Sequence, residues 1–393
     1  MYRAAVVFES SPFDRKGMFN AIHERIRHLS AVSGYEIDVY CIHSRDNAFT
    51  RRVRHTVRVP DVESVDVEGI RYDILWYRFS ITDHILVNKL HREPVFFRWF
   101  IKTNTDRFKD YDIIIAHSFT AGLLANSVFR KYSVPYYVTW HGSDVHTHPW
   151  KNPLVLSNTR SIMEQASCNF YVSESLMKSS LKITGNSVSD ILYNGVSDRF
   201  VRYDDSRRRE LRYSYGVDED EKVVAFVGNL HAVKNAELLI PIFAQMQSSY
   251  EGKLHFWIIG DGKLRKSIEE SLASDKSGMK IRMWGNQPAG LMPDLMNCID
   301  LLVLPSKNEG LPLVCLEALK CGAKVVGSNV GGIPEVIGDD NVVDPGGAFV
   351  GQISQKAVSM LSSDYMQPVP DKFSWHKTAL KEMEAIVSIL KSE

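Results

Sequence analysis

The chain has 393 residues, 44% of them apolar, and its 47 lysine and arginine residues are balanced by 47 aspartate and glutamate residues. This length favours two domains over one, and the apolar fraction is enough for a core in each. A neutral chain lacks the general basic surface that nucleic-acid binding requires. Residues 1–195 nevertheless carry a net charge of +4, which suits an acidic substrate or a lipid surface.

The five cysteines form no C-x-x-C pair. They therefore indicate reduced, buried thiols, and support neither a zinc site nor a disulfide framework. The first residues, Met1–Glu9, have too short an apolar run for a signal peptide and predict a first strand. No window approaches the ~20 apolar residues of a membrane span. We expect a cytoplasmic protein, soluble or peripheral on the inner face of the membrane.

Short apolar runs alternate with helical patterns along the chain, which predicts parallel βαβ units. The expected strands are residues 4–8, 36–42, 113–117, 136–140 and 169–172, and then 223–227, 255–259, 301–304 and 323–326. The pattern pauses at 197–220, a charged segment that fits a linker and a leading helix. The prediction is an α/β fold of two Rossmann-like domains, with the ligand between the carboxyl ends of their strands.

The most informative motif is a pair of carboxylates, Glu309 and Glu317, separated by a Gly-Leu-Pro turn. Proline suits the first turn of a helix, so a helix is expected over about 312–319, and its free amides would favour an anion. Two carboxylates beside an anion site, each able to bind a hydroxyl pair, describe a site for a nucleotide-sugar. The simpler interpretation is a strand–loop–helix unit with two solvated glutamates. The glycine loop 331–335, which predicts close backbone approach, favours the functional interpretation.

Two further loops follow strands of the second half. In the loop after 223–227, Gly228 permits close approach of a ligand, and Lys234 places a point charge towards a phosphate. The alternative is an ordinary turn with a surface lysine. In the loop after 255–259, Gly260 and Gly262 resemble the start of a dinucleotide fingerprint, but Arg265 replaces the third glycine. That loop predicts a tight βα turn.

Three histidines and an aspartate fall within residues 141–148. Metal sites usually combine regularly spaced ligands with others elsewhere, and no other residues complete a set here. His141, at the carboxyl end of a strand, is therefore the functional candidate, whereas His146 and His148 are expected to be loop residues.

Residues 83–102 interleave aromatic and basic side chains. They fit a membrane interface. We favour the alternative, in which Phe96, Phe97, Phe100 and Ile101 pack a core helix while Arg98 and Lys102 are solvated.

Taken in order, these motifs resemble the family 4 retaining glycosyltransferases of the GT-B fold, along nearly the whole chain. The matching segments are 139–144, 172–176, 193–196, 227–234, 259–262, 305–317 and 331–335. The resemblance implies two Rossmann-like domains facing across a cleft. Residues 1–196 would bind the acceptor and residues 197–372 the donor, and the final helix, within 373–393, would cross back onto the first domain.

The resemblance also implies roles for single residues. Glu309 would bind hydroxyls of the donor sugar, Glu317 the ribose, and His141 would lie beside the transferred sugar. Lys234 and the amides of Leu313 and Val314 would hold the diphosphate. The catalytic residues would be His141, Lys234 and Glu309, and the remaining donor contacts would come from Gly17, Gly228, Asn229, Gly310 and Leu311. Two departures from the family are Asn229, where an arginine is usual, and the single glycine, Gly17, in the first loop.

The activity implied is retaining transfer of a hexose-type sugar from a UDP- or GDP-linked donor to a hydroxyl, without a metal or other cofactor. The acceptor would be a glycan or lipid-linked glycan of the bacterial envelope, chosen by loops such as 45–58 and 65–79. Peripheral membrane contact would involve the N-terminal domain. The alternatives are a nucleotide-sugar epimerase or hydrolase, an NAD-dependent oxidoreductase, which Arg265 disfavours, and a binding protein without chemistry. The acidic run 218–220 is expected at the sheet edge away from the cleft.

Overall fold

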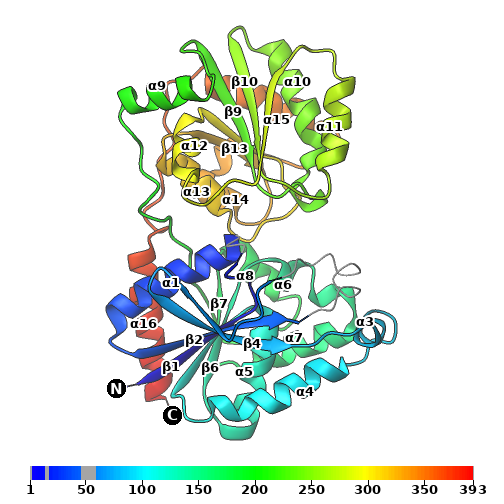
Figure 1. The fold of residues 1–393 in the computed structure, drawn as a ribbon, viewed down its shortest axis with the longest axis vertical. Coiled ribbons are helices and arrows are strands. Elements are labelled where there is room, and N and C mark those ends of the chain that lie inside the picture. Colours follow the sequence, from blue (N-terminus) through cyan, green and yellow to red (C-terminus); the bar gives the residue numbers. More distant parts are fainter. Residues whose placement is uncertain (1, 14–16, 46–58, 393) are drawn as a thin grey trace. The chain divides into compact units, whose positions relative to one another are not determined.

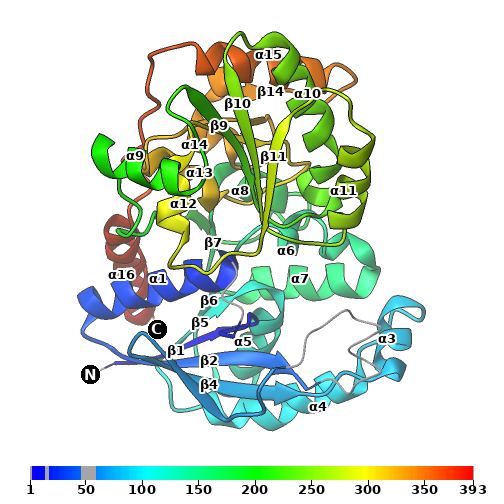
Figure 2. The same cartoon turned by 45° about the horizontal axis from the view of Figure 1, so that its top comes forward.

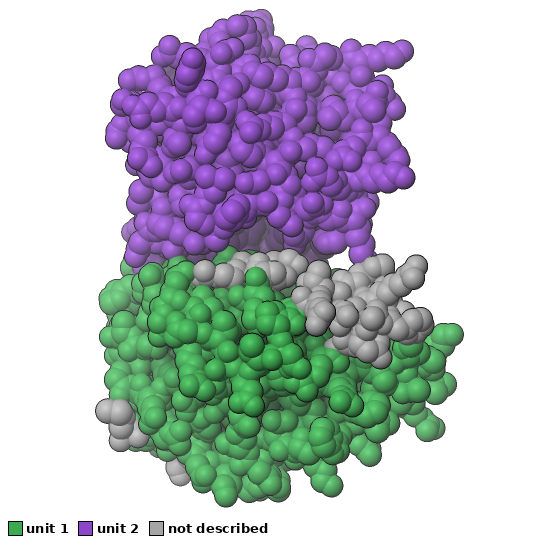
Figure 3. Space-filling view, viewed as in Figure 1, with its two compact units in different colours: residues 1–194, 375–393 green, residues 195–374 purple. Residues whose placement is uncertain are grey.

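The structure is a computed structural model that describes residues 2–13, 17–45 and 59–392. It divides into two compact units, which Figure 3 draws in separate colours. Unit 1 comprises residues 1–194 and 375–393, and unit 2 comprises residues 195–374. Each unit has its own sheet.

Unit 1 is built on an eight-stranded sheet with the order β3-β4-β2-β1-β5-β6-β7-β8, in which only the β3–β4 pair is antiparallel. The strands are β1 (Arg3–Phe8), β2 (Glu36–Ser44), β3 (Ser64–Val67), β4 (Ile70–Tyr77), β5 (Ile113–His117), β6 (Tyr136–Trp140), β7 (Cys168–Tyr171) and β8 (Ser189–Ile191). Every residue of β5, β6 and β7 is buried. Strands covered by helices on both faces read as continuous apolar runs, which is why the sequence located them.

The helices of unit 1 include the last helix of the chain. They are α1 (Gly17–Ser33), α3 (Ile81–Asn88), α4 (Val95–Asn104), α5 (Ser118–Tyr132), α6 (Ser143–His146), α7 (Pro153–Gln165), α8 (Glu174–Ser180) and α16 (Trp375–Lys391). Figures 1 and 2 show α16 beside α1. Glu382 of α16 accepts a hydrogen bond from the Tyr137 hydroxyl at 2.7 Å, and its carboxylate lies 3.9 Å from the guanidinium of buried Arg25. The end of the chain is therefore part of the unit 1 core.

Unit 2 has a six-stranded, wholly parallel sheet with the order β11-β10-β9-β12-β13-β14. The strands are β9 (Glu221–Val227), β10 (Lys253–Ile259), β11 (Lys280–Gly285), β12 (Leu301–Leu304), β13 (Lys324–Ser328) and β14 (Val342–Val343). The helices are α9 (Asp205–Ser214), α10 (Leu239–Ser249), α11 (Arg265–Ser274), α12 (Met292–Cys298), α13 (Leu313–Lys320), α14 (Ile333–Ile337) and α15 (Phe349–Leu361). This is the strand order of the doubly wound nucleotide-binding fold.

The predicted α/β class is confirmed, and each predicted strand is found with ends shifted by at most two residues. The helix predicted over about 312–319 is α13, one residue further on. The sequence missed the strands that lie near or at the sheet edges: β3, β4, β8, β11 and β14. Four of these strands are partly exposed, so their residues are mixed, and the fifth, β14, is buried but has only two residues. In β11, for example, exposed and half-buried residues alternate at the start and none is fully buried.

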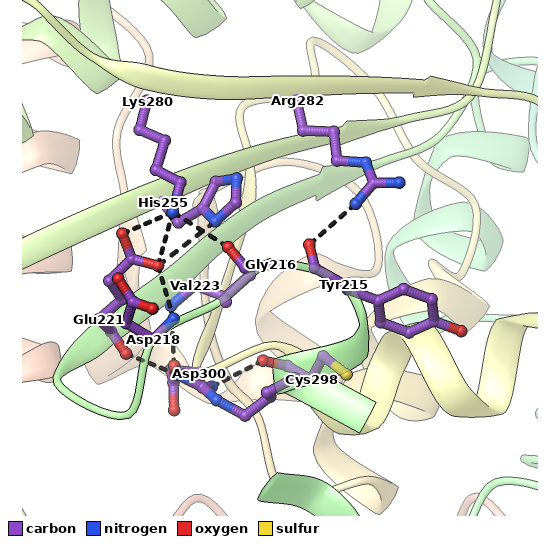
Figure 4. Close-up of polar contacts among 11 residues, drawn as sticks. Tyr215, Gly216, Asp218, Glu221, Val223, His255, Lys280, Arg282, Cys298 and Asp300 are labelled. Carbon is purple, nitrogen blue, oxygen red and sulfur yellow. Dashed lines mark hydrogen bonds and ion pairs between the residues drawn. The ribbon is translucent and has the colours of Figure 1, made fainter. Parts of the chain in front are cut away.

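A polar network holds the amino end of the unit 2 sheet (Figure 4). Glu221 at the start of β9 accepts two hydrogen bonds from the Lys280 ammonium, at 2.8 and 2.9 Å, and one from the amide of Asp218 at 2.9 Å. Arg212 of α9 reaches the Asp300 carboxylate at 2.8 Å. The acidic run 218–220 thus lies at the amino end of β9, opposite the carboxyl ends of the strands.

All five cysteines are free and buried, as predicted. Within the described parts of the chain, no helix has the length and apolar character needed to cross a membrane.

Candidate functional site

The strand order of unit 2 reverses between β9 and β12. The chain leaves β9 towards β10 on one side and leaves β12 towards β13 on the other, so their loops part at the carboxyl edge. Such a switch point is where open α/β sheets bind ligands. The loop after β9 carries Gly228 and Lys234, and the loop after β12 carries Ser306 and Glu309. Two motifs far apart in the sequence therefore meet at one place.

The two loops are joined by a direct ion pair. The Lys234 ammonium donates to Glu309 Oε1 at 2.5 Å, and the Ser306 hydroxyl donates to the same oxygen at 2.6 Å. The Lys234 side chain is 23% exposed and the Glu309 side chain 9%. Ser306 is fixed in turn, because its carbonyl accepts a hydrogen bond from Ser328 at the end of β13. One carboxylate oxygen is thus occupied, and the pair is held at the switch point.

The glycine loop after β13 packs against the backbone of Glu309. Gly331 has φ +54°, and a Cβ on it would stand 1.9 Å from the Glu309 carbonyl oxygen. The amide of Gly332 donates to the same oxygen at 3.4 Å. The close backbone approach predicted for this loop is therefore an approach to the backbone of Glu309.

The Gly260-Asp261-Gly262 loop has an equally structural explanation. A Cβ on Gly260 would stand 2.0 Å from the Gly228 carbonyl oxygen, and one on Gly262 would stand 2.4 Å from that of Leu230. The amide of Leu230 donates to the Asp261 carbonyl at 3.0 Å. The two glycines let the loop after β10 pack on the loop after β9. The predicted tight turn is confirmed, and packing alone accounts for its glycines.

The amino end of α13 lies next in the chain after Glu309. Its N-cap residue is Pro312, and no side chain caps the helix, so the first-turn amides of Leu313 and Val314 have no intrahelical acceptor. Both residues are half-buried. An uncapped amino end at the carboxyl edge of a parallel sheet favours an anion.

Glu317 lies one turn further along α13. Burial raises the pKa of its carboxyl to about 7, and the positive charge of Arg199 opposes that rise. In the described parts of the chain its carboxylate makes no hydrogen bond. Burial raises the pKa of the neighbouring Cys315 thiol well above its usual value, Glu309 and Glu317 raise it further, and Lys234 lowers it. All three charged candidates of unit 2 therefore act on the pKa of one buried thiol.

The remaining donor candidates of unit 2 surround this centre. Gly228 has φ +156°, and a Cβ there would stand 3.3 Å from the ring of Phe226. Asn229, where the family usually has an arginine, is exposed. Gly310 is half-buried and Leu311 is buried.

In unit 1, His141 follows β6, and its Nε2 lies 3.1 Å from Nδ1 of His117 at the end of β5. Burial lowers the pKa of His141 to about 3, with the charge of Arg25 adding to the effect. Burial also lowers the pKa of His117 well below its usual value. The Asp144 carboxylate accepts from the amides of His141, at 3.1 and 3.2 Å, and Gly142, at 2.7 Å. The lowered pKa favours the neutral form of the His141 imidazole, and Asp144 fixes the backbone that carries it.

Sequence reasoning missed His117, although it has the signal that selected His141, a histidine at the carboxyl end of a buried strand. Gly17 is the first residue of α1, where it is exposed, and a Cβ on it would meet no described atom within 4 Å. Of the proposed acceptor loops, residues 46–58 lie outside the described residues, and 65–79 contains β4 and most of β3. No group of three or more potential metal ligands was found among the residues that the structure describes.

Comparison with known proteins agrees with this fold. Residues 17–183 match the glycosyl transferase 4-like domain, and residues 207–363 match glycosyl transferases group 1. The chain is 27% identical over 336 residues to the putative teichuronic acid biosynthesis glycosyltransferase TuaC of Bacillus subtilis, covering 84% of this chain and 81% of that protein. The chain belongs to the group 1 glycosyltransferases, the family 4 proteins of the GT-B fold.

Solved structures share the whole fold at low sequence identity. Sucrose-phosphate synthase from Thermosynechococcus elongatus superimposes with a TM-score of 0.71 at 15% identity, covering all of both chains. HepE of Anabaena in complex with UDP gives a TM-score of 0.67 at 17% identity, covering 99% of this chain and 98% of that one. A further structure of HepE contains UDP-glucose.

Proposed function

We propose that this glycosyltransferase moves a hexose-type sugar from a nucleoside diphosphate sugar to a hydroxyl acceptor, with retention of configuration and without a metal. The observation that carries the proposal is the Lys234–Glu309 pair at the switch point of unit 2. It sets a cation and a carboxylate beside a free helix amino end, which are the groups that a diphosphate joined to a sugar requires.

The donor is assigned to these groups by their chemistry. Glu309 has Oε1 engaged by Lys234 and Ser306, which leaves Oε2 for hydroxyls of the sugar. The diphosphate lies against the first-turn amides of α13, with the Lys234 ammonium beside it. Glu317, one turn along the helix and without a hydrogen bond, accepts from the ribose hydroxyls.

The chemistry requires charge stabilisation of the departing diphosphate. Lys234 and the α13 amides are fixed before the donor binds, and such preorganised groups stabilise developing charge most effectively. Asn229 supplies no positive charge, so Lys234 carries more of the leaving-group charge than in relatives with an arginine there. With this charge stabilised, the acceptor attacks on the face that the diphosphate leaves.

The acceptor is a glycan or lipid-linked glycan of the bacterial envelope. The similarity to a relative named for teichuronic acid biosynthesis supports this class. The base of the donor is uracil or guanine, and the HepE complexes with UDP and UDP-glucose favour uracil through the shared fold.

The test is thermal unfolding with UDP, GDP, ADP or NAD at saturating concentration. A ligand at about 100 times its dissociation constant adds about 2.7 kcal/mol to the free energy of unfolding. We expect UDP or GDP to stabilise the protein, Lys234→Ala and Glu317→Ala to lose most of this shift, and the exposed Lys263→Ala to keep it.

Other outcomes decide between the alternatives. Stabilisation by NAD alone would favour the oxidoreductase, and no response to any nucleotide would contradict the proposal. Analysis of the sugar product with and without an acceptor then separates transfer from epimerisation or hydrolysis.

A further inference from the structure

The α3–α4 hairpin of unit 1, residues 81–104, has an apolar outer face. Val95, Phe96 and Trp99 of α4 are 57%, 41% and 65% exposed. Ile81, Ile85 and Leu90 are exposed as well. The prediction that Phe96 packs in the core is therefore wrong, whereas Phe100 is buried as expected. Helix α4 is apolar on two sides, and only one of them is used for packing within unit 1.

The hairpin is fixed in place. Asp83 of α3 is fully buried, and its carboxylate accepts from the amide of Val95 at 2.7 Å, which caps the start of α4. On the inner side, the rings of Phe97 and Phe100 pack against Tyr77 at 5.3 and 5.7 Å. The outer apolar side chains therefore stand on two helices that are anchored to the sheet.

Three exposed cations accompany these apolar side chains, Lys89, Arg92 and Lys102, while a fourth, Arg98, lines the cavity on the inner side of the hairpin. None of them makes an ion pair with any residue that the structure describes, and Glu93 is the one exposed acid of the hairpin. Tryptophan, phenylalanine and unpaired cations together match the interface of an anionic bilayer, where rings enter the headgroup layer and cations meet phosphates. A symmetric contact with a second copy would instead oppose like charges.

A cavity of about 580 Å³ lies against the inner side of the hairpin. Phe97 and Ile101 of α4, Leu123 of α5 and Val155 of α7 contribute apolar lining. Glu9, which follows β1, also lines it and accepts from the hydroxyls of Thr120 at 2.5 Å and Tyr77 at 2.9 Å. Both oxygens of Glu9 are thus engaged within unit 1, and the cavity combines this polar edge of Glu9, Tyr77 and Thr120 with an apolar wall for a hydrocarbon chain.

Glu9 also marks where the cavity lies in the sheet. The strand order of unit 1 reverses between β1 and β5, and the Glu9–Thr120 hydrogen bond joins the residue after β1 to the first turn of α5, the helix that follows β5. The cavity thus lies at the switch point of unit 1, where such sheets bind ligands.

We propose that the α3–α4 hairpin docks on an anionic lipid surface and that the acceptor is lipid-linked, with its sugar in the cavity behind the hairpin. This rests on the proposed glycosyltransferase function and narrows its acceptor class. The hairpin is one wall of the cavity and also the lipid-facing surface, so an acceptor carried in the bilayer has a short route to the switch point.

The test is sedimentation of the full chain with vesicles of phosphatidylcholine, with or without phosphatidylglycerol. We expect binding only to the anionic vesicles, weakened by salt. The triple variant Val95→Ser, Phe96→Ser, Trp99→Ser should bind about tenfold more weakly or worse. Replacing Lys89, Arg92 and Lys102 with glutamine should weaken binding to the anionic vesicles about fivefold for each cation removed. As a control, Tyr213→Ser replaces an aromatic residue of α9 that is 83% exposed, and should bind like the parent protein.

Equal binding to both vesicle types, or unchanged binding by both hairpin variants, would overturn the proposal. So would a dimer in light scattering that the triple variant converts to a monomer, without vesicle binding. Stabilisation by UDP or GDP is measured separately by thermal unfolding, and it is expected to depend on Lys234 and Glu317 in unit 2. A failure of lipid docking with nucleotide stabilisation intact would therefore leave the proposed transferase function standing.

Discussion

The ammonium of Lys234 lies 2.5 Å from Oε1 of Glu309, although 75 positions separate the two residues. The contact joins the loops after β9 and β12 across the switch point of unit 2. A carboxylate side chain that is only 9% exposed is thereby held in one orientation. Two loops that are far apart in the sequence are therefore fixed to each other at this edge of the sheet.

Removal of the Glu309 carboxylate should abolish most of the transfer activity. We expect Glu309→Ala to lower kcat/KM by ~10²-fold or more, because it removes both the sugar contact and the partner of Lys234. The matched control is Glu270→Ala on α11, an exposed carboxylate. Steady-state kinetics with the stabilising nucleotide's sugar make the comparison, and near-normal transfer by Glu309→Ala would reject the assignment.

The ion pair should appear as coupling between its members. Lys234→Met alone leaves the Glu309 carboxylate with Ser306 as its remaining partner, whereas the double variant with Glu309→Gln leaves no unpaired charge. We expect the double variant to be more stable than the sum of the single effects predicts, by ~0.5–3 kcal/mol. Urea unfolding of the four proteins measures this coupling, and additive effects would mean that the contact contributes nothing.

The raised pKa of Glu317 should give donor binding a pH dependence. A carboxylate with a pKa of about 7 is mostly protonated at pH 6 and charged at pH 8. If the charged form accepts from the ribose, the dissociation constant for the nucleoside diphosphate should rise about tenfold from pH 8 to pH 6. Glu317→Gln should bind weakly and lose this dependence, and calorimetric titration at the two pH values distinguishes the cases.

The raised pKa of Glu317 also predicts that the free energy of unfolding falls as the pH rises, whereas donor binding becomes tighter. The folded pKa of Glu317 lies above its ordinary value of 4.5, so the folded state holds the proton more tightly between pH 4.5 and 7. Its contribution to the free energy of unfolding is therefore lost as the pH rises through 7. The ligand-free Glu317→Gln variant should gain Tm relative to the parent at pH 8 and not at pH 5. An equal change at both values would speak against a buried, titrating carboxyl.

Gly331 should tolerate no side chain. A Cβ there would meet the Glu309 carbonyl oxygen, and φ +54° adds the strain of a left-handed residue, roughly 1–2 kcal/mol. Gly331→Ala should therefore destabilise the protein by more than this strain and displace Glu309, with loss of transfer. Gly346→Ala is the control, because its Cβ would meet nothing within 4 Å. Similar urea midpoints for the two variants would contradict this account.

The sequence by itself determined the fold class, the central strands and the positions of the motifs. Strands such as β5, β6 and β12 are buried on both faces. A strand of this kind is a continuous apolar run, which can be recognised in the sequence without knowing what it packs against. The start of helix α13 could be predicted from Pro312, because a proline in the first turn of a helix is a local feature of the sequence. The order and spacing of the motifs indicated the family for the same reason, since each motif is a short segment.

Only the tertiary structure decided which groups meet. Partners far apart in the sequence, such as Lys234 with Glu309 and Gly331 with the Glu309 carbonyl, are brought together by strand order, which no local pattern encodes. Likewise, the apolar pattern of α4 could not show that Phe96 and Trp99 face outward, because hydrophobicity alone does not say which of two apolar sides packs on the sheet. The apolar residues of a segment show that it can be buried, and the tertiary structure determines which residues it packs against.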